Sequence, residues 1–348
     1  MSRRTRANAG RGTARTMRGL SLIELMVAVV IGLLVVLAAI GIFISNRATY
    51  QTADAMGRIQ EGARTAFELM ASDLREADGT LCRALQPKSE DPAQSQGLPM
   101  MNLLTSTEWW ADWGDGLLGY DNGALKGSVT GTDAIELRSA TRDGQGVYGS
   151  TFAGVKQLTM EDRPLQLNYE SGMPVLLCDG RQATLFIIEL LPKTQTGRGP
   201  AFYEFKPATA GNCGSGLGIG PVCGASEYWY KGETMWPEGT PNVGYGVANA
   251  KMAPMQAVRW YVGKSAAGSG NALYRRTSKD NAEVIDGVRD LQLTYLLPGA
   301  SGYVTAAQVG TRWKQVRAVR VALELEGGTG EPLRRRIVHV VGLRSRNP

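Results

Sequence analysis

The sequence contains a single histidine, His339, and four cysteines in 348 residues. One histidine excludes metal sites built from several histidines and leaves His339 as the sole candidate for histidine-based catalysis. It lies in an apolar, alternating segment, where a structural role is expected. Four cysteines are too few for a small scaffold held together by disulfides. HExxH, phosphate-loop and nucleophile-elbow patterns are also missing. The sequence therefore predicts a protein that is not an enzyme, with no metal and no cofactor.

Acidic residues are missing from the first nineteen positions, which carry six of the 38 basic residues of the chain. Without these six, 32 basic residues face 32 acidic residues, so the remainder is formally neutral. A basic chain can bind nucleic acid or a membrane surface. Because the excess is confined to one end, nucleic acid is an unlikely partner and a membrane flank is favoured. The six residues are Arg3, Arg4, Arg6, Arg11, Arg15 and Arg18.

A run of twenty uncharged residues follows, from Leu25 to Ile44. At about 1.5 Å per residue, a helix of this length spans about 30 Å, the thickness of the bilayer hydrocarbon. The run is too long for an ordinary secretory signal, and no small-residue cleavage site follows it. A buried core helix is the alternative. The arginine-rich flank favours a single-pass inner-membrane helix with a cytoplasmic N-terminus and a periplasmic C-terminal part.

A carboxylate, Glu24, stands at the start of this apolar run. A charged side chain costs about 2.5–3.5 kcal/mol at the centre of a membrane helix and less near an end. Glu24 should therefore have a partner. Cleavage after Gly19 would supply one, because it exposes an α-amine on Leu20. Alternatively, Glu24 is simply favoured in the first helical turn by the helix dipole.

The segment Gly19-Leu20-Ser21-Leu22-Ile23-Glu24-Leu25 resembles the class III signal of type IV prepilins and pseudopilins. The resemblance implies that a prepilin peptidase cuts between Gly19 and Leu20 and methylates the new N-terminus at Leu20. It also implies that Glu24, the fifth residue after the cut, pairs with the terminal amine of a neighbouring subunit. The first residue after the cut is usually phenylalanine in this family, and Leu20 departs from that pattern.

Helical periodicity continues beyond the apolar run. An apolar stripe recurs every three or four residues, which is typical of an amphipathic helix. The charged residues of this part, including Asp73, are expected on the other faces, and Gly79 is expected to end the helix. We therefore predict three parts: a cytoplasmic leader at 1–19, a helix at 20–78 with its transmembrane part at 25–44, and a periplasmic β-rich domain at 79–348. The stripe consists of Met56, Ile59, Ala63, Phe67, Met70 and Leu74.

The C-terminal part reads as closely spaced strands without helix-length connections, which favours antiparallel pairing. The apolar residues from Val319 to Leu325 alternate with Arg320, Ala322 and Glu324, as burial of one face requires. The predicted fold is α+β and pilin-like, with the long helix packed on an antiparallel sheet. The expected strands are 134–138, 183–191, 257–262, 273–276, 291–297, 316–325 and 336–343.

The same C-terminal region resembles PilW-type minor pilins. The resemblance implies a minor pilin that is incorporated into the type IV pilus, or into its initiation or tip complex, to promote assembly. Implied partners are other major and minor pilins, the inner-membrane assembly platform and, before assembly, the lipid bilayer. A type II secretion pseudopilin and a membrane-anchored periplasmic binding protein are the alternatives. The residues that carry the resemblance are Trp260-Tyr261, Leu273-Tyr274-Arg275, residues 284–293, Tyr295, Trp313, Val316, Val319-Arg320-Val321 and residues 342–347.

The cysteines would lie in an oxidising compartment if the β-rich part is periplasmic. Four cysteines allow three pairings. Cys213 and Cys223 would close a small glycine-rich loop, with a chain-entropy gain of about 2.5–3 kcal/mol. We expect this pair, together with Cys82 and Cys178. Free buried thiols are the alternative.

Aromatic and basic clusters give weaker signals. Trp109, Trp110 and Trp113, like the cluster at 228–236, could form a contact surface, although a satellite core is favoured. The arginines at 334–336, with Arg344 and Arg346, form a basic C-terminal patch. DNA phosphates are one conceivable partner for this patch, and a solvated strand edge is favoured.

Overall fold

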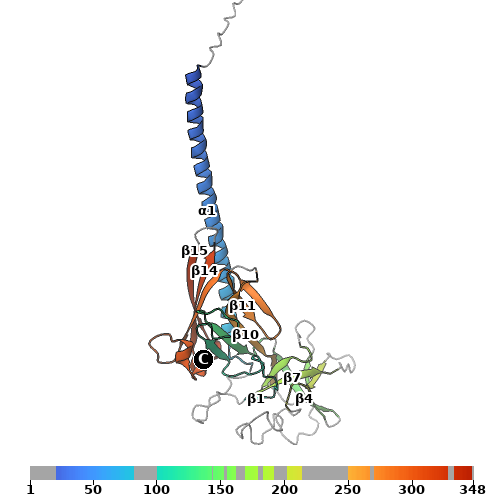
Figure 1. Cartoon of the computed structure of the whole chain (residues 1–348). Coiled ribbons are helices and arrows are strands. Elements are labelled where there is room, and N and C mark those ends of the chain that lie inside the picture. Colours follow the sequence, from blue (N-terminus) through green and yellow to red (C-terminus); the bar gives the residue numbers. More distant parts are fainter. Residues whose placement is uncertain are drawn as a thin grey trace, which may run out of the picture. The chain divides into compact units, whose positions relative to one another are not determined.

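A computed structural model describes residues 21–81, 100–142, 144–152, 155–161, 169–178, 183–191, 202–213, 250–266, 270–327 and 333–346. The chain divides into two compact units, Met1–Ala55 and Met56–Pro348. Helix α1, Leu22–Glu76, is continuous and supplies residues to both units. Its bounds lie within two residues of the predicted 20–78. Strands make up most of the second unit (Figure 1).

The second half of α1 buries five of the six residues of the predicted stripe, whereas Met56 is only partly buried. Ile59, Ala63, Phe67, Met70 and Leu74 all belong to the main hydrophobic core of the second unit. The helix is followed by a tight turn in which Asp78 adopts a left-handed conformation, with φ of 59°. The sequence predicted a stop at Gly79, but the left-handed residue is an aspartate. Aspartate tolerates this conformation better than most residues because its short side chain can form local hydrogen bonds.

A five-stranded antiparallel sheet supplies one wall of this core. Its order is β12-β11-β10-β3-β2. The side chains of Ile135, Leu137 and Trp260 point from it into the core. The expected strands at 134–138, 257–262 and 273–276 are confirmed here. The strands are β2 (Leu117–Tyr120), β3 (Ala134–Ser139), β10 (Gln256–Lys264), β11 (Asn271–Arg276) and β12 (Asn281–Ile285).

A three-stranded antiparallel sheet, β13-β14-β15, supplies a second wall. Its strands are β13 (Val288–Leu296), β14 (Ala318–Gly327) and β15 (Leu333–Gly342). The odd-numbered residues from Val319 to Leu325 are buried in the core, as the alternation predicted. The connection between β13 and β14 contains α2 (Ala306–Val309) and the 3-10 turn η2 (Trp313–Gln315). A further 3-10 turn, η3 (Arg344–Arg346), follows β15.

The middle of the chain forms a separate sheet with its own core. The strand order is β1-β7-β6-β9-β4-β5-β8, and an additional β7–β8 pairing joins six of these strands into a ring. The pairing of β1 with β7 is parallel, unlike the other strand pairings of the described residues. Phe186, Ile188 and Phe205 lie in the core of this sheet. The strands are β1 (Met100–Asn102), β4 (Gln145–Phe152), β5 (Val155–Glu161), β6 (Pro174–Cys178), β7 (Ala183–Leu190), β8 (Phe202–Pro207) and β9 (Ala250–Pro254).

These observations confirm the predicted α+β fold, a long N-terminal helix with an antiparallel β domain. They also show that Trp113 belongs to a satellite core, because its side chain is fully buried, whereas Trp109 and Trp110 are partly exposed. The second aromatic cluster, at 228–236, lies outside the described residues. His339 stacks on Phe67, with ring centroids 4.3 Å apart, which fits the predicted structural role.

One close approach in the main core depends on glycine. Gly119 in β2 faces the rings of Tyr295 and Trp313, and a Cβ built at Gly119 would overlap the Tyr295 phenol. The two rings meet edge to face at 5.0 Å. Tyr295 is completely buried, and this burial raises its pKa well above the ordinary value. Its hydroxyl has no hydrogen-bond partner among the described residues.

We therefore expect Gly119→Ala to lower the free energy of unfolding by about 1–3 kcal/mol, the usual effect of overpacking a core. Denaturant unfolding of the full chain in detergent micelles, followed by tryptophan fluorescence, measures this. Gly302→Ala is the matched control because its Cβ would meet nothing within 4 Å. Equal stability of the two variants would contradict the steric account.

Candidate assembly site

The first part of the candidate site is the N-terminal turn of α1. The backbone N–H of Ser21 donates to Glu24 Oε2 at 3.5 Å, and the backbone N–H of Glu24 donates to Ser21 Oγ at 3.3 Å. These reciprocal bonds form a capping box, which satisfies two backbone donors that a helix start otherwise leaves unpaired. Glu24 therefore has a local role in the uncut chain. Gly19 and Leu20, the residues of the predicted cleavage bond, lie outside the described residues.

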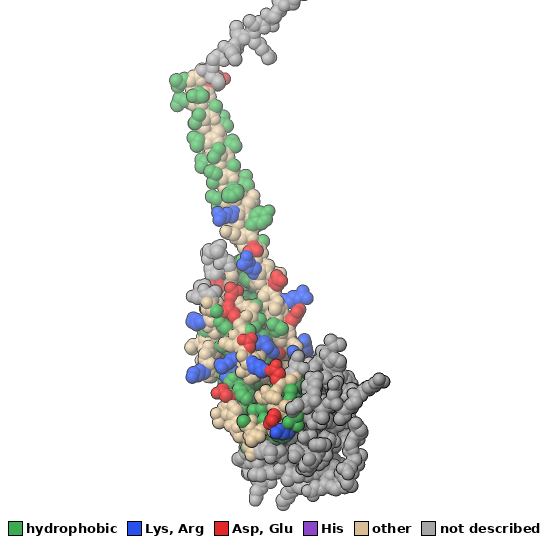
Figure 2. All heavy atoms as spheres, turned by 90° about the vertical axis from the view of Figure 1, so that its right-hand side faces the viewer, with side chains coloured by type: hydrophobic (Ala, Val, Ile, Leu, Met, Phe, Trp, Pro, Cys, Tyr) green, Lys and Arg blue, Asp and Glu red, His purple; other side chains and the backbone are tan. Residues whose placement is uncertain are grey.

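The second part is the apolar surface of α1 that follows Glu24. The large hydrophobic side chains between Leu25 and Ile44 are about half exposed or more. Figure 2 shows mainly hydrophobic side chains along the visible face of this segment. The helix is long and apolar enough to cross a membrane. So much apolar surface is unfavourable in water, so lipid or other apolar helices must cover it.

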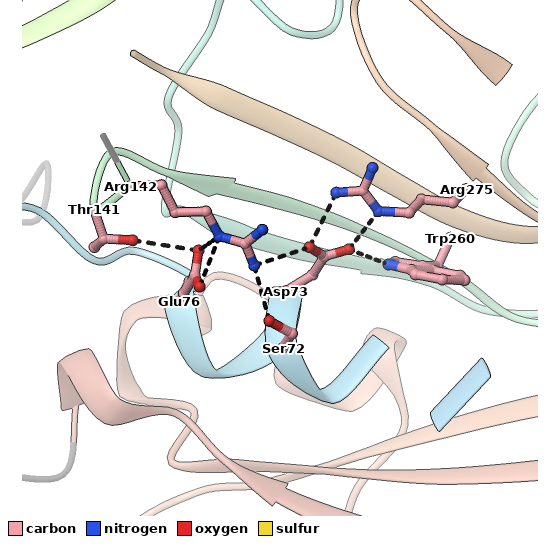
Figure 3. A network of polar contacts seen from close by, with 7 residues as sticks. All are labelled: Ser72, Asp73, Glu76, Thr141, Arg142, Trp260 and Arg275. Carbon is pink, nitrogen blue, oxygen red and sulfur yellow. Dashed lines mark hydrogen bonds and ion pairs between the residues drawn. The ribbon is translucent and has the colours of Figure 1, made fainter. Parts of the chain in front are cut away.

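The third part is a set of polar contacts near the C-terminal end of α1, within the second unit. Asp73 is buried, although the sequence predicted it on an outer polar face; this prediction was wrong. Trp260 Nε1 donates to its carboxylate at 2.9 Å. Arg275 donates through Nε at 2.8 Å and through Nη2 at 3.0 Å. Figure 3 shows both side chains reaching Asp73 from the sheet strands above the helix.

Glu76, one turn further along, makes the next contact. Arg142 Nε donates to both Glu76 carboxylate oxygens, at 2.8 and 2.7 Å. Arg142 Nη2 also donates to Ser72 Oγ at 2.8 Å, and Thr141 Oγ1 donates to Glu76 Oε2 at 3.3 Å (Figure 3). Arg142 thus spans one turn of the helix from the segment that follows β3.

Asp78 makes the last contact, just past the helix end. Its carboxylate accepts hydrogen bonds from Trp113 Nε1 at 3.1 Å, Lys314 Nζ at 2.8 Å and Arg346 Nε at 3.4 Å. Its backbone N–H donates to the Arg138 carbonyl at 2.7 Å. Through its carboxylate Asp78 joins the helix end to three segments that are distant in the sequence, and through its backbone N–H to a fourth.

Arg346 belongs to this buried set and not to the exposed basic patch in which the sequence placed it. Its guanidinium donates to the backbone carbonyls of Trp313, Val316 and Asp115. Burial lowers its pKa, and the nearby Asp78 carboxylate opposes this shift. Ser345 Oγ donates to the Ala77 carbonyl at 2.7 Å. Turn η3 thus provides partners for groups that the helix end leaves without intrahelical bonds.

Within the second unit, the three carboxylates Asp73, Glu76 and Asp78 hold the C-terminal end of α1 against the strands through contacts of defined geometry. Apolar packing alone tolerates small shifts, whereas ion pairs and indole bonds have defined geometry. The sequence offered one signal for Asp73: it lies three residues after Met70 and next to Leu74, at the edge of the buried stripe. No sequence pattern indicated its arginine or tryptophan partners.

The structure describes two of the four cysteines. Cys178 and Cys213 are both disulfide-bonded. Cys82 and Cys223 lie outside the described residues. The pairing of Cys213 with Cys223 and of Cys82 with Cys178 therefore stays a prediction.

Two comparisons with protein families bear on this arrangement. Residues 14–40 match the prokaryotic N-terminal methylation motif, which spans the predicted cleavage bond, Glu24 and most of the apolar run. Residues 259–335 match the type IV pilus-assembly protein W family. Searches of curated proteins and of solved structures each returned no match.

The motif identifies a type IV prepilin-like chain, and it implies processing by prepilin peptidase and association with other pilins. The second match supports a PilW-type, type IV prepilin-like protein. Both families describe pilins and pilus assembly, not enzymes. With the apolar helix, they suggest a membrane-anchored, pilin-related protein.

The buried carboxylate at Asp73 can be tested directly. Asp73→Asn retains the shape and an acceptor for Trp260 but leaves the Arg275 guanidinium without its charged partner. We expect a loss of about 3 kcal/mol in the free energy of unfolding, as for other broken buried pairs. Denaturant unfolding of the full chain in micelles measures the loss.

Arg64→Gln is the control for this experiment, because it breaks the exposed Arg64–Glu68 pair on the same helix. Exposed pairs of this kind contribute about 0.5 kcal/mol or less. A similar loss in both variants would show that Asp73 does not anchor the helix.

Proposed function

We propose that this chain is a minor pilin of the type IV pilus. Prepilin peptidase cuts it after Gly19 and methylates Leu20, and it then joins the pilus or its initiation or tip complex. The observation that carries the proposal is the methylation motif, which coincides with the apolar first part of α1, whose residues are all exposed. The match of residues 259–335 to the pilus-assembly family favours the pilus over a type II secretion pseudopilus.

Assembly transfers the segment from Leu25 to Ile44 from lipid into contact with equivalent helices of other subunits. Both surroundings are apolar, so the transfer itself changes little hydrophobic free energy. An ion pair between Glu24 and a neighbouring subunit then makes the contact between the helices directional and specific. Glu24 gives up the hydrogen bond that it accepts from the Ser21 N–H. It instead accepts hydrogen bonds from the terminal amine of a neighbouring subunit. This ion pair offsets the cost of burying both charges. Electrostatics thus selects one axial register between subunits.

The anchoring carboxylates complete the mechanism. A filament subunit transmits tension between its apolar helix and its β domain. A helix held only by apolar packing could slide, because dispersion contacts are individually weak and non-directional. Asp73, Glu76 and Asp78 oppose sliding, since any axial shift breaks several charge-assisted hydrogen bonds at once. The protein does no chemistry in this account, because the peptidase acts on it.

Processing is tested by producing the full chain with and without a prepilin peptidase and measuring its intact mass. We expect peptidase-dependent loss of residues 1–19 and addition of one methyl group. Gly19→Val should block the cut, because a branched side chain replaces hydrogen at the scissile position. A membrane-anchored binding protein that is not a pilin would keep residues 1–19 under both conditions, and that result would overturn the proposal.

The role of Glu24 is tested in cells that assemble pili. Glu24→Val should leave membrane insertion intact, since it removes a charge from an apolar helix. It should reduce incorporation into sheared filaments at least tenfold, as measured by immunoblots of filament and membrane fractions. Glu68→Gln, an exposed change further along α1, is the control. Normal incorporation of Glu24→Val would rule out the pairing role.

A further inference from the structure

Strand β15 is the free edge of the three-stranded sheet. It pairs with β14 along its whole length, from Gly342 opposite Ala318 to Leu333 opposite Gly327. Among the described residues, no strand pairs with its other side. Half of the backbone hydrogen-bonding groups of a ten-residue strand therefore face outward. Such an edge can accept a further strand.

The two faces of β15 differ in kind. Ile337 and Val341 pack into or against the main core, and His339 stacks on Phe67. Val338 and Val340 point to the opposite side and are 40% and 56% exposed. Apart from Leu69, they are the exposed large hydrophobic residues of the described chain after Tyr50. Two adjacent exposed valines on a free edge are unusual, because soluble proteins tend to shield such edges.

The first half of β15 carries three consecutive arginines, Arg334, Arg335 and Arg336, all exposed. Arg334 Nε lies 2.9 Å from Glu326 on β14. Arg289 lies 3.3 Å from Glu324 and 3.5 Å from Glu326, so Arg289 and Arg334 together balance these two carboxylates and the charges of Arg335 and Arg336 remain in excess. The edge is therefore positive at one end and apolar at the other.

We propose that the free edge of β15 receives an extended acidic segment of a partner protein as an additional strand. Its backbone would pair with the outward N–H and C=O groups of β15. On the outward face it would place carboxylates opposite Arg334 and Arg336, and β-branched residues opposite Val338 and Val340. Cross-strand pairs of opposite charge and of apolar residues are the ones that stabilise a sheet.

A second copy of this chain fits the edge less well. Two β15 strands paired antiparallel and centred on Ile337 would place Arg334 and Arg336 opposite Val340 and Val338, so neither the charges nor the valines would find matched partners. A nucleic acid would use the arginines but neither the unpaired backbone groups nor the valines. The proposal does not depend on cleavage after Gly19, so it can fail while the proposed function stands.

The test uses the full chain in detergent micelles and two short fluorescent peptides, Val-Thr-Val-Thr-Glu-Thr-Glu and its reverse. We expect one of them to bind at least tenfold more tightly than the same peptide with lysine in place of glutamate. Hydrogen exchange should show new protection of β15 amides on binding. Failure of both peptides to bind, or binding without this protection, would overturn the proposal.

Matched variants separate the contributions. Arg336→Glu should weaken binding at least tenfold, which corresponds to about 1.4 kcal/mol, and the lysine peptide should then bind better than the glutamate peptide. Arg276→Glu, an exposed arginine on β11, is the control and should have no effect. A proline-containing peptide of the same charge should not bind, since proline cannot donate to the ladder.

Three outcomes contradict strand addition: equal binding of the proline peptide, an equal effect of Arg276→Glu, and tighter binding of a short single-stranded DNA that protects no β15 amide. The first two outcomes would show that the peptides bind by non-specific charge attraction. The third would show that the arginines bind the phosphates of a nucleic acid. Denaturant unfolding of each variant confirms that the fold is retained.

Discussion

The buried carboxylate of Asp73 is the interaction on which the placement of the long helix depends. It lies at the edge of an apolar stripe and is held by Trp260 and Arg275, which come from neighbouring strands of one sheet. An unpaired charge in this position would destabilise the core, so the helix and the sheet must meet in one register. Glu76 and Asp78 repeat the arrangement over the following residues. Apolar packing supplies most of the free energy, and these carboxylates make the arrangement unique.

The polar C-terminal end of α1 and its apolar N-terminal part require different surroundings. From Leu25 to Ile44 the side chains are uniformly apolar and exposed, so they suit any apolar surroundings. The Asp73 carboxylate, by contrast, has defined partners in Trp260 and Arg275. The first part can therefore exchange lipid for protein without specific contacts, whereas the second part cannot move without breaking bonds. The proposed role, in which the chain leaves a membrane to join a filament, requires both properties.

The sequence predicted the helix, most of its buried stripe and the strands from 257 onward except β12, because each is encoded by local periodicity. Asp73 and Arg346 were assigned to exposed surfaces, because residue type indicates exposure unless the partner is known, and the partners lie far away in the chain. Of the middle sheet the sequence predicted one strand, 183–191, which is β7, and its other strands and their pairing were missed for the same reason. Strands β6 and β9 are neighbours although more than seventy residues separate Cys178 from Lys251. Pairing over such distances has no local signature.

The contacts of η3 have a consequence for the order of events during synthesis. Ser345 and Arg346 follow their partners at the helix end by 268 positions. A ribosome delivers the helix first, and the whole β domain must emerge before these two side chains exist. Until then the Ala77 carbonyl and the Asp78 carboxylate lack part of their final bonding. The contacts of Ser345 and Arg346 with the end of α1 can therefore form only after β15 has been synthesised.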